Sequence, residues 1–329
     1  YDENKTFGFF KDNIKKTSWL DLPFVRRKHR AFIPFMPMAA KFLRSREKYD
    51  LIFSSTAGYG KGINIEAPYH ISYCHSPLRY AWEIDYLKNL PFSPCPLKEI
   101  IVRPIANWLR NWDKRSAQNV NIFIANSRYI ADKINSYYGR EAQVVYPPVN
   151  LDVFYPESTT SKKEYYLMTG RLLYYKGFDL GIKAFNLLRK PLRIIGAGPE
   201  TEKLKKIADP HYIQFVPFVS DNELRVLYSD AKAFIFPQIE DFGLVAAEAQ
   251  ACGLPVLAFN LGGGREIVED KKTGLLFNEQ TPEAIVSAVN DFERLDFDRR
   301  YIAKRANMFS KQNFKSQIKE IVRESGFTI

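Results

Sequence analysis

Two glutamates eight residues apart, Glu240 and Glu248, stand on either side of a glycine, and their spacing suggests chemistry on a hydroxyl-rich ligand. Gly243 opens a stretch rich in Ala, Leu and Glu, so we expect a helix to start there after a loop. The unpaired N–H groups of a helix start bind anions, and glycine lets an anion approach the main chain. A diphosphate could sit on the amides near Phe242 to Val245, with one glutamate reaching hydroxyls on each side. The alternative is that Glu240 and Asp241 only complement the helix dipole while Glu248 is a solvated helix residue.

Two cations, Arg171 and Lys176, lie about seventy residues upstream in the segment GRLLYYKG. They follow an apolar run, Tyr165–Thr169, which has the character of a buried strand. In open α/β sheets ligands bind beyond the carboxyl ends of the strands, where these two residues would stand. Arginine offers a planar fork to phosphate and lysine a point charge, so together they would neutralise most of a leaving diphosphate. The alternative is two surface cations in a loop.

The elements that would position these residues are short strands that alternate with helices. Ala233–Phe236 reads as a buried strand that Pro237 ends, and the helix after Gly243 continues to Cys252, where a Gly-Leu-Pro sequence stops it. The segment IIGAGPE could be mistaken for a dinucleotide fingerprint, but Thr201 stands where the third glycine belongs. We therefore expect a tight strand-to-helix turn there, in an α/β fold.

Four segments carry a family resemblance: GRLLYYKG, IIGAGPE, FPQIEDFGLVAAEAQACGLPV and GGGREIVEDKKTGLLF. In that order and spacing they resemble the C-terminal half of family 4 retaining glycosyltransferases of the GT-B fold, and the glutamates match that family's E-x7-E signature. The resemblance covers roughly residues 49 to 325. It implies two Rossmann-like domains that face each other across a cleft.

Upstream segments narrow the resemblance: ISYCHSPLRYAW, WDKRSA, ANSRYIADKI and VVYPPVN. They are similar to the bacterial O-antigen mannosyltransferase subgroup, which implies a hexosyltransferase that uses GDP-mannose and a glycan acceptor on a polyprenyl lipid carrier. A same-family alternative takes a UDP- or ADP-sugar, because the expected base-binding loop near Phe218 to Asn222 holds no decisive residue. An alternative of another class is a non-catalytic module that binds a sugar nucleotide or nucleic acid.

The resemblance also implies roles in the second half of the chain. Arg171 and Lys176 would hold the diphosphate, Glu240 would hydrogen-bond the transferred sugar, and Glu248 would hold the ribose. The remaining donor-binding candidates there are Gly170, Val219, Phe242, Gly243 and Leu244, the last two through backbone amides.

In the first half, His75 matches the histidine that lies beside the transferred sugar in relatives. A lone histidine after a strand is more often structural, but this one ends the apolar run ISYC and is followed by Ser76-Pro77 in a loop at the cleft-facing strand end, which favours a functional role. Arg79 would contact phosphate or acceptor, or make a surface ion pair. Ser127 is either a ligand contact or the N-cap of the helix that follows it.

The expected mechanism needs no metal or other cofactor, because fixed cations and helix-start amides stabilise the charge that builds on the leaving diphosphate. The sequence Asp296-Phe297-Asp298 resembles the metal-binding D-x-D of GT-A enzymes, but it falls late, between helical stretches, where helix capping explains it. The resemblance implies attack from the face of the leaving group, with retention of the anomer. A double displacement through Glu240 is the alternative.

Net charge differs between the two halves. Residues 1–150 hold 23 Lys and Arg against 13 Asp and Glu, whereas residues 151–329 hold 25 against 24. Arg26, Arg27, Lys28 and Arg30 are interleaved with aromatic residues, which suits an anionic membrane surface. Single-stranded nucleic acid and a plain solvated face are the alternatives, and no nucleic-acid partner is expected. We predict a cytoplasmic protein, peripheral on the inner face of the plasma membrane.

The sequence suggests where the domains of the chain begin and end. Residues 1–148 are expected to form the N-terminal, acceptor-side domain, without its first strand and glycine-rich loop; residues 149–310 the nucleotide-sugar domain; and residues 311–329 a helix that crosses back to the first. The segment Pro147–Asn150 reads as the hinge. Cys74, Cys95 and Cys252 lie far apart, without metal or redox spacing, so no structural disulfide is expected.

Overall fold

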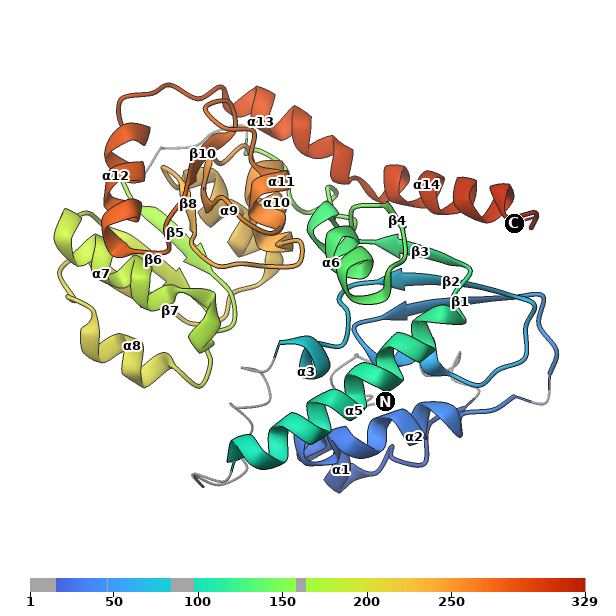
Figure 1. Ribbon diagram of the computed structural model, residues 1–329. Helices are drawn as coiled ribbons and strands as arrows, with labels where there is room; N and C mark the ends of the chain where they lie inside the picture. Colours follow the sequence, from blue (N-terminus) through green and yellow to red (C-terminus); the bar gives the residue numbers. More distant parts are fainter. Residues whose placement is uncertain (1–15, 46, 84–97, 158–163, 329) are drawn as a thin grey trace. The chain divides into compact units, whose positions relative to one another are not determined.

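The computed structural model describes residues 16–45, 47–83, 98–157 and 164–328, and the chain divides into two compact units, Tyr1–Val144 and Val145–Ile329. The division falls just before the predicted hinge. Each unit is an α/β fold built on one parallel sheet, which confirms the expected fold class (Figure 1). The arrangement across a cleft and the return of the last helix to the first unit stay predictions.

The first unit holds a four-stranded sheet in the order β1-β2-β3-β4, and all its neighbouring strands are parallel. Its strands are β1 (Leu51–Thr56), β2 (Tyr69–Cys74), β3 (Ile122–Ala125) and β4 (Ala142–Val144). Cys74 pairs with Thr56 on one side and Ala125 on the other, so three strands end at one level. His75 follows at once, and its N–H donates to the Thr56 carbonyl at 2.8 Å.

The helical segments of the first unit include one long helix and several short ones. They are α1 (Pro23–Arg27), η3 (His29–Phe35), α2 (Met36–Lys41), η4 (Tyr59–Gly62), α3 (Arg79–Trp82), α5 (Lys98–Gln118) and α6 (Arg128–Tyr138). Ser127 caps α6, since its hydroxyl accepts from Ile130 N, which confirms the capping interpretation of this serine. Gly139 ends the helix in the left-handed conformation, with φ of 65°.

A buried charge network fixes the interior of this unit. Lys61 and Asp113 form an ion pair of 2.5 Å in which neither side chain has exposed surface. The other carboxylate oxygen of Asp113 accepts from Trp82 Nε1 at 2.8 Å and from the Tyr138 hydroxyl at 2.6 Å. A buried ion pair is tolerated when its remaining hydrogen-bonding capacity is satisfied, so the aspartate of the WDKRSA segment has a structural role.

The second unit holds a six-stranded parallel sheet in the order β10-β9-β8-β5-β6-β7. Its strands are β5 (Tyr166–Thr169), β6 (Leu192–Ile195), β7 (Ile213–Val216), β8 (Phe234–Phe236), β9 (Val256–Phe259) and β10 (Gly274–Phe277). The chain runs outward from β5 through β6 to β7, returns to lie beside β5 as β8, and then runs outward the other way. This reversal makes the β5/β8 boundary the switch point at which open α/β sheets bind ligands.

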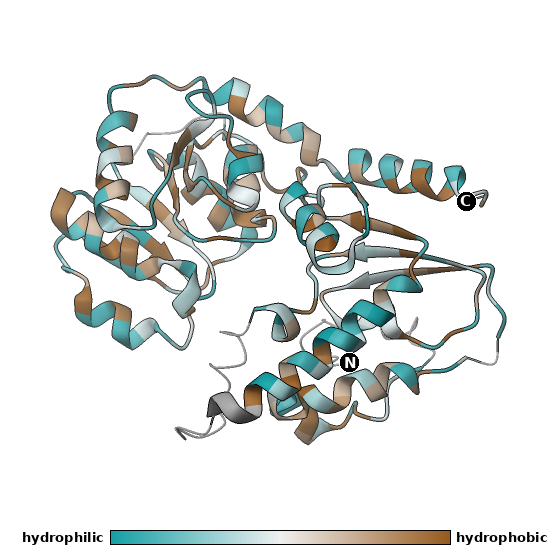
Figure 2. Cartoon of the chain, in the orientation of Figure 1, coloured by the Kyte–Doolittle hydropathy of each residue, from teal (hydrophilic) through white to brown (hydrophobic). Residues whose placement is uncertain are grey.

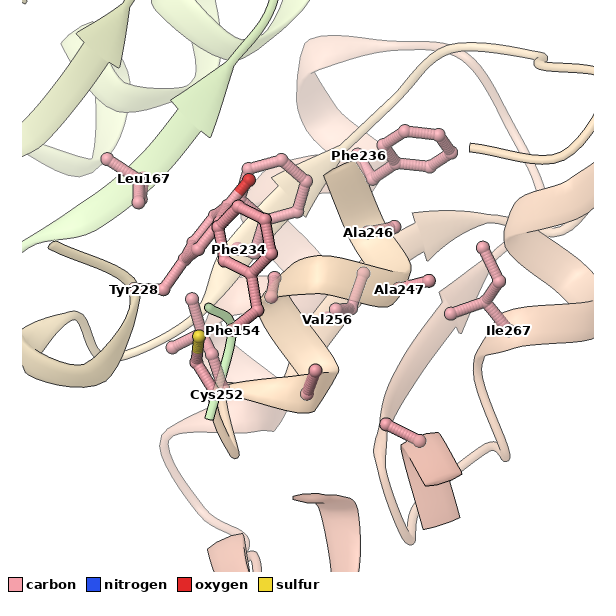
Figure 3. Close-up of a cluster of buried hydrophobic side chains, with 14 of the residues drawn as sticks. Phe154, Leu167, Tyr228, Phe234, Phe236, Ala246, Ala247, Cys252, Val256 and Ile267 are labelled. Carbon is pink, nitrogen blue, oxygen red and sulfur yellow. The ribbon is translucent and has the colours of Figure 1, made fainter. Parts of the chain in front are cut away.

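Side chains of these strands alternate between two hydrophobic clusters, one on each face of the sheet. Leu167, Phe234 and Phe236 belong to one cluster, whereas Tyr166 and Ile235 belong to the other. The first cluster also takes in Ala246 and Ala247 of α10 (Figure 3). This alternation with a period of two, on strands buried on both faces, explains why each strand reads as a continuous apolar run.

The helices of the second unit connect these strands and follow the last one. They are η5 (Tyr174–Lys176), α7 (Phe178–Leu188), α8 (Thr201–Ile207), α9 (Asp221–Asp230), α10 (Leu244–Ala251), α11 (Gly263–Ile267), α12 (Pro282–Phe292), α13 (Arg299–Ala306), η6 (Asn307–Phe309) and α14 (Lys311–Glu324). Asp298 caps α13 by accepting from Arg300 N and Tyr301 N, as the capping interpretation of the D-x-D predicts.

Hydrophobic residues concentrate in the strands and alternate with hydrophilic ones along the helices (Figure 2). Within the described residues, no helix combines the length and the apolar character that a membrane span needs. Cys74 and Cys252 are buried free thiols, and Cys95 lies outside the described residues.

Candidate functional site

The residues predicted to bind the diphosphate and the transferred sugar lie together at the switch point of the second sheet. Arg171 and Lys176 follow β5, and Glu240 and Gly243 follow β8, its neighbour in the sheet. Parallel neighbours bring their carboxyl ends to one edge, so two loops far apart in sequence stand side by side there. The sequence predicts that each loop follows a strand end, whereas the strand order that makes the two strands neighbours comes from the structure.

The loop that carries Arg171 rests on the turn after β6. Leu172 N donates to the Ala197 carbonyl at 3.1 Å, and a Cβ atom added at Gly196 would lie 2.1 Å from the Gly170 carbonyl oxygen. A Cβ at Gly198 would lie 2.2 Å from the Leu172 carbonyl oxygen. The glycines of IIGAGPE therefore let two loops touch through their main chains. Arg171 itself is exposed to solvent.

The loop after β8 leads into α10 through Gly243. This glycine has φ of 100°, and an added Cβ would lie 2.7 Å from Phe236 Cζ, so both conformation and space require glycine. The N–H groups of Ala246 and Ala247 both bond to the Gly243 carbonyl. Those of Leu244 and Val245 precede the first intrahelical bond and remain available to an anion, as the sequence predicts.

Phe242 can serve a donor only through its main chain. Its side chain is buried, with its ring centroid 5.7 Å from that of Tyr146 and 5.3 Å from that of Phe309. The segment Gly262–Gly264 supports its backbone: Gly263 N donates to the Glu240 carbonyl at 2.9 Å, and a Cβ at Gly263 would lie 1.7 Å from the Phe242 carbonyl oxygen. We did not predict this supporting role from the sequence, where its signal is the run of three glycines, Gly262–Gly264.

Lys176 and Glu240 form an ion pair in the structure, a contact that we did not predict from the sequence. Gln238 Nε2 adds a hydrogen bond of 3.4 Å to Glu240 Oε1. Gln238 is buried, at 3% exposure, whereas the side chains of Lys176 and Glu240 keep 19% and 22% of their surface. The loop residue two positions before the glutamate thus belongs to the site.

Glu248 stands in the second turn of α10, beyond the helix start. Burial raises the pKa of its carboxyl to about 7, and the nearby negative charge of Asp221 adds to the effect. Asp221 is the first residue of α9, directly after the loop that holds Val219 and the exposed Phe218. Glu248, the residue predicted to bind the ribose, therefore lies near the predicted base-binding loop.

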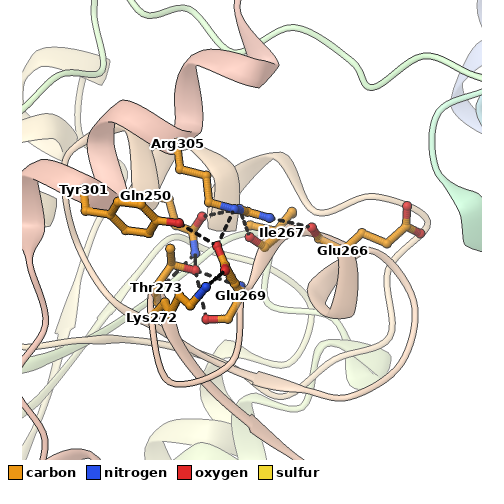
Figure 4. Close-up of polar contacts among 8 residues, drawn as sticks. All are labelled: Gln250, Glu266, Ile267, Glu269, Lys272, Thr273, Tyr301 and Arg305. Atoms are coloured by element: carbon orange, nitrogen blue, oxygen red, sulfur yellow. Dashed lines mark hydrogen bonds and ion pairs between the residues drawn. The ribbon is translucent and has the colours of Figure 1, made fainter.

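The opposite side of α10 is anchored by polar contacts. Gln250 Nε2 donates to Thr273 Oγ1 at 2.9 Å, and Thr273 Oγ1 accepts from Glu269 N at 2.8 Å (Figure 4). Glu269 also accepts from the Tyr301 hydroxyl at 2.9 Å and pairs with Arg305 of α13 at 3.4 Å. These contacts give the EDKKTG part of the resemblance a structural role, which is to hold the helix that presents Glu248.

His75 and Arg79 belong to the first unit. His75 Nε2 lies 2.8 Å from Ser55 Oγ, its carbonyl accepts from Asn126 Nδ2 at 3.0 Å, and its ring packs edge-on at 5.0 Å against Tyr73. Arg79 Nε donates to Ser76 Oγ at 3.3 Å. These contacts fix both residues at the carboxyl end of β2, and their contact with a donor stays a prediction.

Comparison with known proteins finds relatives of both parts of the chain. Residues 16–153 match the model of Glycosyltransferase Family 4, and residues 154–311 match that of Glycosyl transferases group 1. Solved structures share the fold: sucrose-phosphate synthase from Thermosynechococcus elongatus superposes with a TM-score of 0.67 at 21% identity, covering 91% of this chain and 79% of that one. HepE from Anabaena, in complex with UDP and glucose, gives a TM-score of 0.61 at 18% identity, covering 84% and 78%.

Among curated proteins, the chain is 30% identical over 207 residues to the GDP-mannose-dependent alpha-(1-6)-phosphatidylinositol monomannoside mannosyltransferase of Mycolicibacterium smegmatis, covering 54% of each chain. The chain spans about half the length of the curated relatives it matches. The two family matches together extend from residue 16 to residue 311. This protein belongs to the family 4 glycosyltransferases of GT-B fold.

Proposed function

We propose that this chain transfers a hexose from a nucleotide sugar to a glycan acceptor with retention of the anomer. The observation that carries the proposal is the convergence of Arg171, Lys176, Glu240 and the free N–H groups of α10 at one sheet switch point. This set offers two positive charges and a helix start to a diphosphate, and a carboxylate to a sugar hydroxyl.

The chemistry follows from where charge develops. As the bond between sugar and diphosphate breaks, negative charge grows on the phosphate oxygens, where Arg171, Lys176 and the amides of Leu244 and Val245 would stabilise it. The sugar becomes cationic while the acceptor hydroxyl attacks from the face of the leaving group. The departing phosphate takes the hydroxyl proton, so this route needs neither a carboxylate nucleophile nor a metal ion.

GDP-mannose is our first choice of donor, and the acceptor we propose is a lipid-linked glycan of O-antigen type. The GDP-mannose-dependent relative from Mycolicibacterium smegmatis supports this choice of donor. A UDP-sugar is the alternative, because HepE was solved with UDP and glucose. The proposed base-binding loop, near Phe218 to Asn222, runs from just after β7 into the start of α9, and its sequence gives no decisive residue for the choice of base.

Calorimetric titration with GDP, UDP and ADP in the presence of EDTA tests the donor site. Binding of GDP alone would support the mannosyl donor and the absence of a metal requirement together. Tighter binding of UDP or ADP would mean that the donor is a UDP- or ADP-sugar in place of GDP-mannose. Hydrolysis or transfer assays with the matching nucleotide sugar then separate an enzyme from a non-catalytic binding module, since only an enzyme releases the nucleoside diphosphate.

We also propose that the first unit docks on an anionic membrane surface through its segment 19–44. The large apolar side chains exposed in this segment are Trp19 (50%), Leu22 (43%), Phe24 (58%), Phe35 (48%), Met38 (46%) and Phe42 (53%). Arg27, Lys28 and Lys41 are exposed among them, and the ribbons of α1 and α2 carry hydrophobic stretches (Figure 2). Aromatic groups that enter the headgroup region beside cations that meet anionic lipid suit such a surface.

Sedimentation with vesicles of phosphatidylserine and phosphatidylcholine tests this docking. We expect binding at low salt that falls when Phe24→Ser and Phe35→Ser are combined. Leu187→Ser, which changes a side chain 64% exposed on α7, is the matched control and should bind like the unsubstituted chain. A chain that stays in the supernatant at low salt would disprove the docking.

A further inference from the structure

Two residues of the proposed donor site are partners of each other. The ammonium of Lys176 contacts the carboxylate of Glu240, although the first is proposed to hold phosphate and the second a sugar hydroxyl. Arg171 differs, since it is exposed and takes part in no ion pair with any described residue. A diphosphate can therefore reach Arg171 directly, whereas Lys176 must first leave Glu240.

We propose that Glu240 takes the place of the donor diphosphate on Lys176 until donor binds, and that Gln238 then keeps the Glu240 carboxylate in position for the sugar. The inference rests on the proposed function. It makes Gln238 a positioning residue of the transfer reaction, since it acts through Glu240.

The exchange is favoured by charge. A diphosphate offers Lys176 several anionic oxygens, whereas Glu240 offers one carboxylate. The pair is also partly exposed, with 19% and 22% of the two side chains accessible, so breaking it costs far less than breaking a buried pair. Lys176 is thus able to change partner at modest free-energy cost.

Gln238 supplies what Glu240 needs after the ammonium has left. Its carboxamide N–H reaches Glu240 Oε1 at 3.4 Å, and it is a neutral donor that phosphate does not attract away. Burial of Gln238, at 3% exposure, limits its alternative positions. When Lys176 leaves, the partly buried Glu240 carboxylate keeps the hydrogen bond from Gln238. If that bond were also missing, the carboxylate would be left without either donor, which carries a desolvation cost.

The loop backbone is held in place from two other directions. Gln280 Nε2 donates to the Pro237 carbonyl at 2.8 Å, and Gly263 N donates to the Glu240 carbonyl at 2.9 Å. The main chain around Glu240 therefore does not follow the departing ammonium. Only the side-chain contact changes, which leaves the carboxylate directed at the site.

A double-mutant cycle on nucleotide affinity tests the exchange. The probe is GDP, UDP or ADP, whichever binds the unsubstituted chain most tightly, titrated calorimetrically. Glu240→Gln should tighten binding roughly three- to tenfold, because Lys176 no longer has a competing carboxylate. In the Lys176→Met background, Glu240→Gln should change the affinity less than twofold. Damage to the fold cannot tighten binding, so the sign separates the exchange from a structural role.

The positioning role of Gln238 is tested by the split between affinity and rate. Gln238→Met keeps the volume and removes the donor; we expect nucleoside diphosphate affinity within twofold of the unsubstituted chain and a turnover at saturating sugar nucleotide lowered about tenfold. Gln280→Met is the matched control, since it removes a bond to the same loop without touching Glu240. It should lower stability while leaving turnover within about twofold.

The failures are distinguishable. Equal tightening by Glu240→Gln with and without Lys176 would mean simple repulsion between carboxylate and phosphate, and would overturn the exchange while the proposed function stands. Equal turnover in Gln238→Met and Gln280→Met would overturn the positioning role. If the unsubstituted chain binds no nucleoside diphosphate, the proposed function fails, and the exchange fails with it.

Discussion

The two units of this chain use the same kind of sheet in different ways. The four strands of the first unit follow one another in sequence order, β1-β2-β3-β4, so the described part of that sheet has no point where the chain reverses. The second sheet reverses between β5 and β8, and its charged loops gather there. In open α/β sheets such a reversal is where ligands bind, which is why we propose the donor site in the second unit.

The two units also differ in how they use a lysine–carboxylate pair. Lys61 and Asp113 in the first unit have no exposed side-chain surface, and Trp82 and Tyr138 complete the carboxylate's hydrogen bonds. Lys176 and Glu240 in the second unit are partly exposed. A buried pair stabilises a fold only while it is complete, whereas an accessible pair can be exchanged for a ligand.

The largest expected effect breaks the buried pair. Asp113→Asn leaves the Lys61 ammonium without its counter-charge in the interior, so we expect the free energy of unfolding to fall by about 3–5 kcal/mol. Lys176→Met should lower it by less than about 1 kcal/mol. Urea denaturation of both variants measures this difference in the free energy of unfolding. Equal losses of stability in the two variants would mean that the two ion pairs contribute equally to the fold.

The next effect is on turnover and belongs to the second unit. Arg171→Ala or Lys176→Ala should each lower the turnover number about 10²- to 10³-fold, the scale of removing one preorganised group that stabilises developing charge. Lys183→Ala is the control, because Lys183 pairs with Asp179 on the exposed side of α7. Near-normal turnover in both site variants would remove the assigned roles.

Two glycines, one in each unit, sharpen the comparison. Gly243→Ala meets a positive φ and the Phe236 ring at once, so we expect a loss of about 2–3 kcal/mol together with weaker nucleotide binding. Gly139→Ala at the end of α6 meets a positive φ but no atom within 4 Å, so about 1 kcal/mol is expected, without any effect on binding. Thermal unfolding and calorimetry report both quantities.

The last prediction concerns pH. The pKa of Glu248 is raised to about 7 in the folded chain, above its unfolded value, so the folded state keeps a proton that the unfolded state has lost. Its contribution is fully present below the unfolded pKa, and stability falls as pH rises toward 7, with a slope of at most about 1.4 kcal/mol per pH unit.

Glu248→Gln should flatten this slope, whereas Glu202→Gln, at an exposed position on α8, should leave it unchanged. Stability curves in urea at several pH values between 4 and 8 give the measurement. The Glu248 variant should also bind nucleotide more weakly, while its rate at saturating donor stays closer to normal. An unchanged affinity with a changed rate would contradict the ribose role.

Local features of this fold could be predicted from the sequence. The strand before Gly170, the helix after Gly243, the cap at Ser127 and the cap at Asp298 each depend on a few neighbouring residues. The sequence also places Arg171 and Glu240 each after the end of a strand, where ligands bind in open α/β sheets. Family resemblance then supplied the roles.

Contacts that depend on strand order could not be predicted. Lys61 and Asp113 are 52 residues apart, and Lys176 and Glu240 are 64 apart. Either lysine reads equally well as a solvated cation until the sheet order is known. Gln238 gave no signal for the same reason, since an amide in a loop has many partners in principle and only the folded loop selects one.

The close contact between glycines and neighbouring main chains has a consequence for mutational tolerance. Gly196, Gly198 and Gly263 lie where any side chain would overlap a carbonyl of the loops that carry Arg171 and Glu240. In a saturation scan of the chain, these positions should therefore accept no substitution, although they have no side chain to offer a ligand. The scan would then mark the loops of the proposed donor site through glycines whose only contribution is the absence of a side chain.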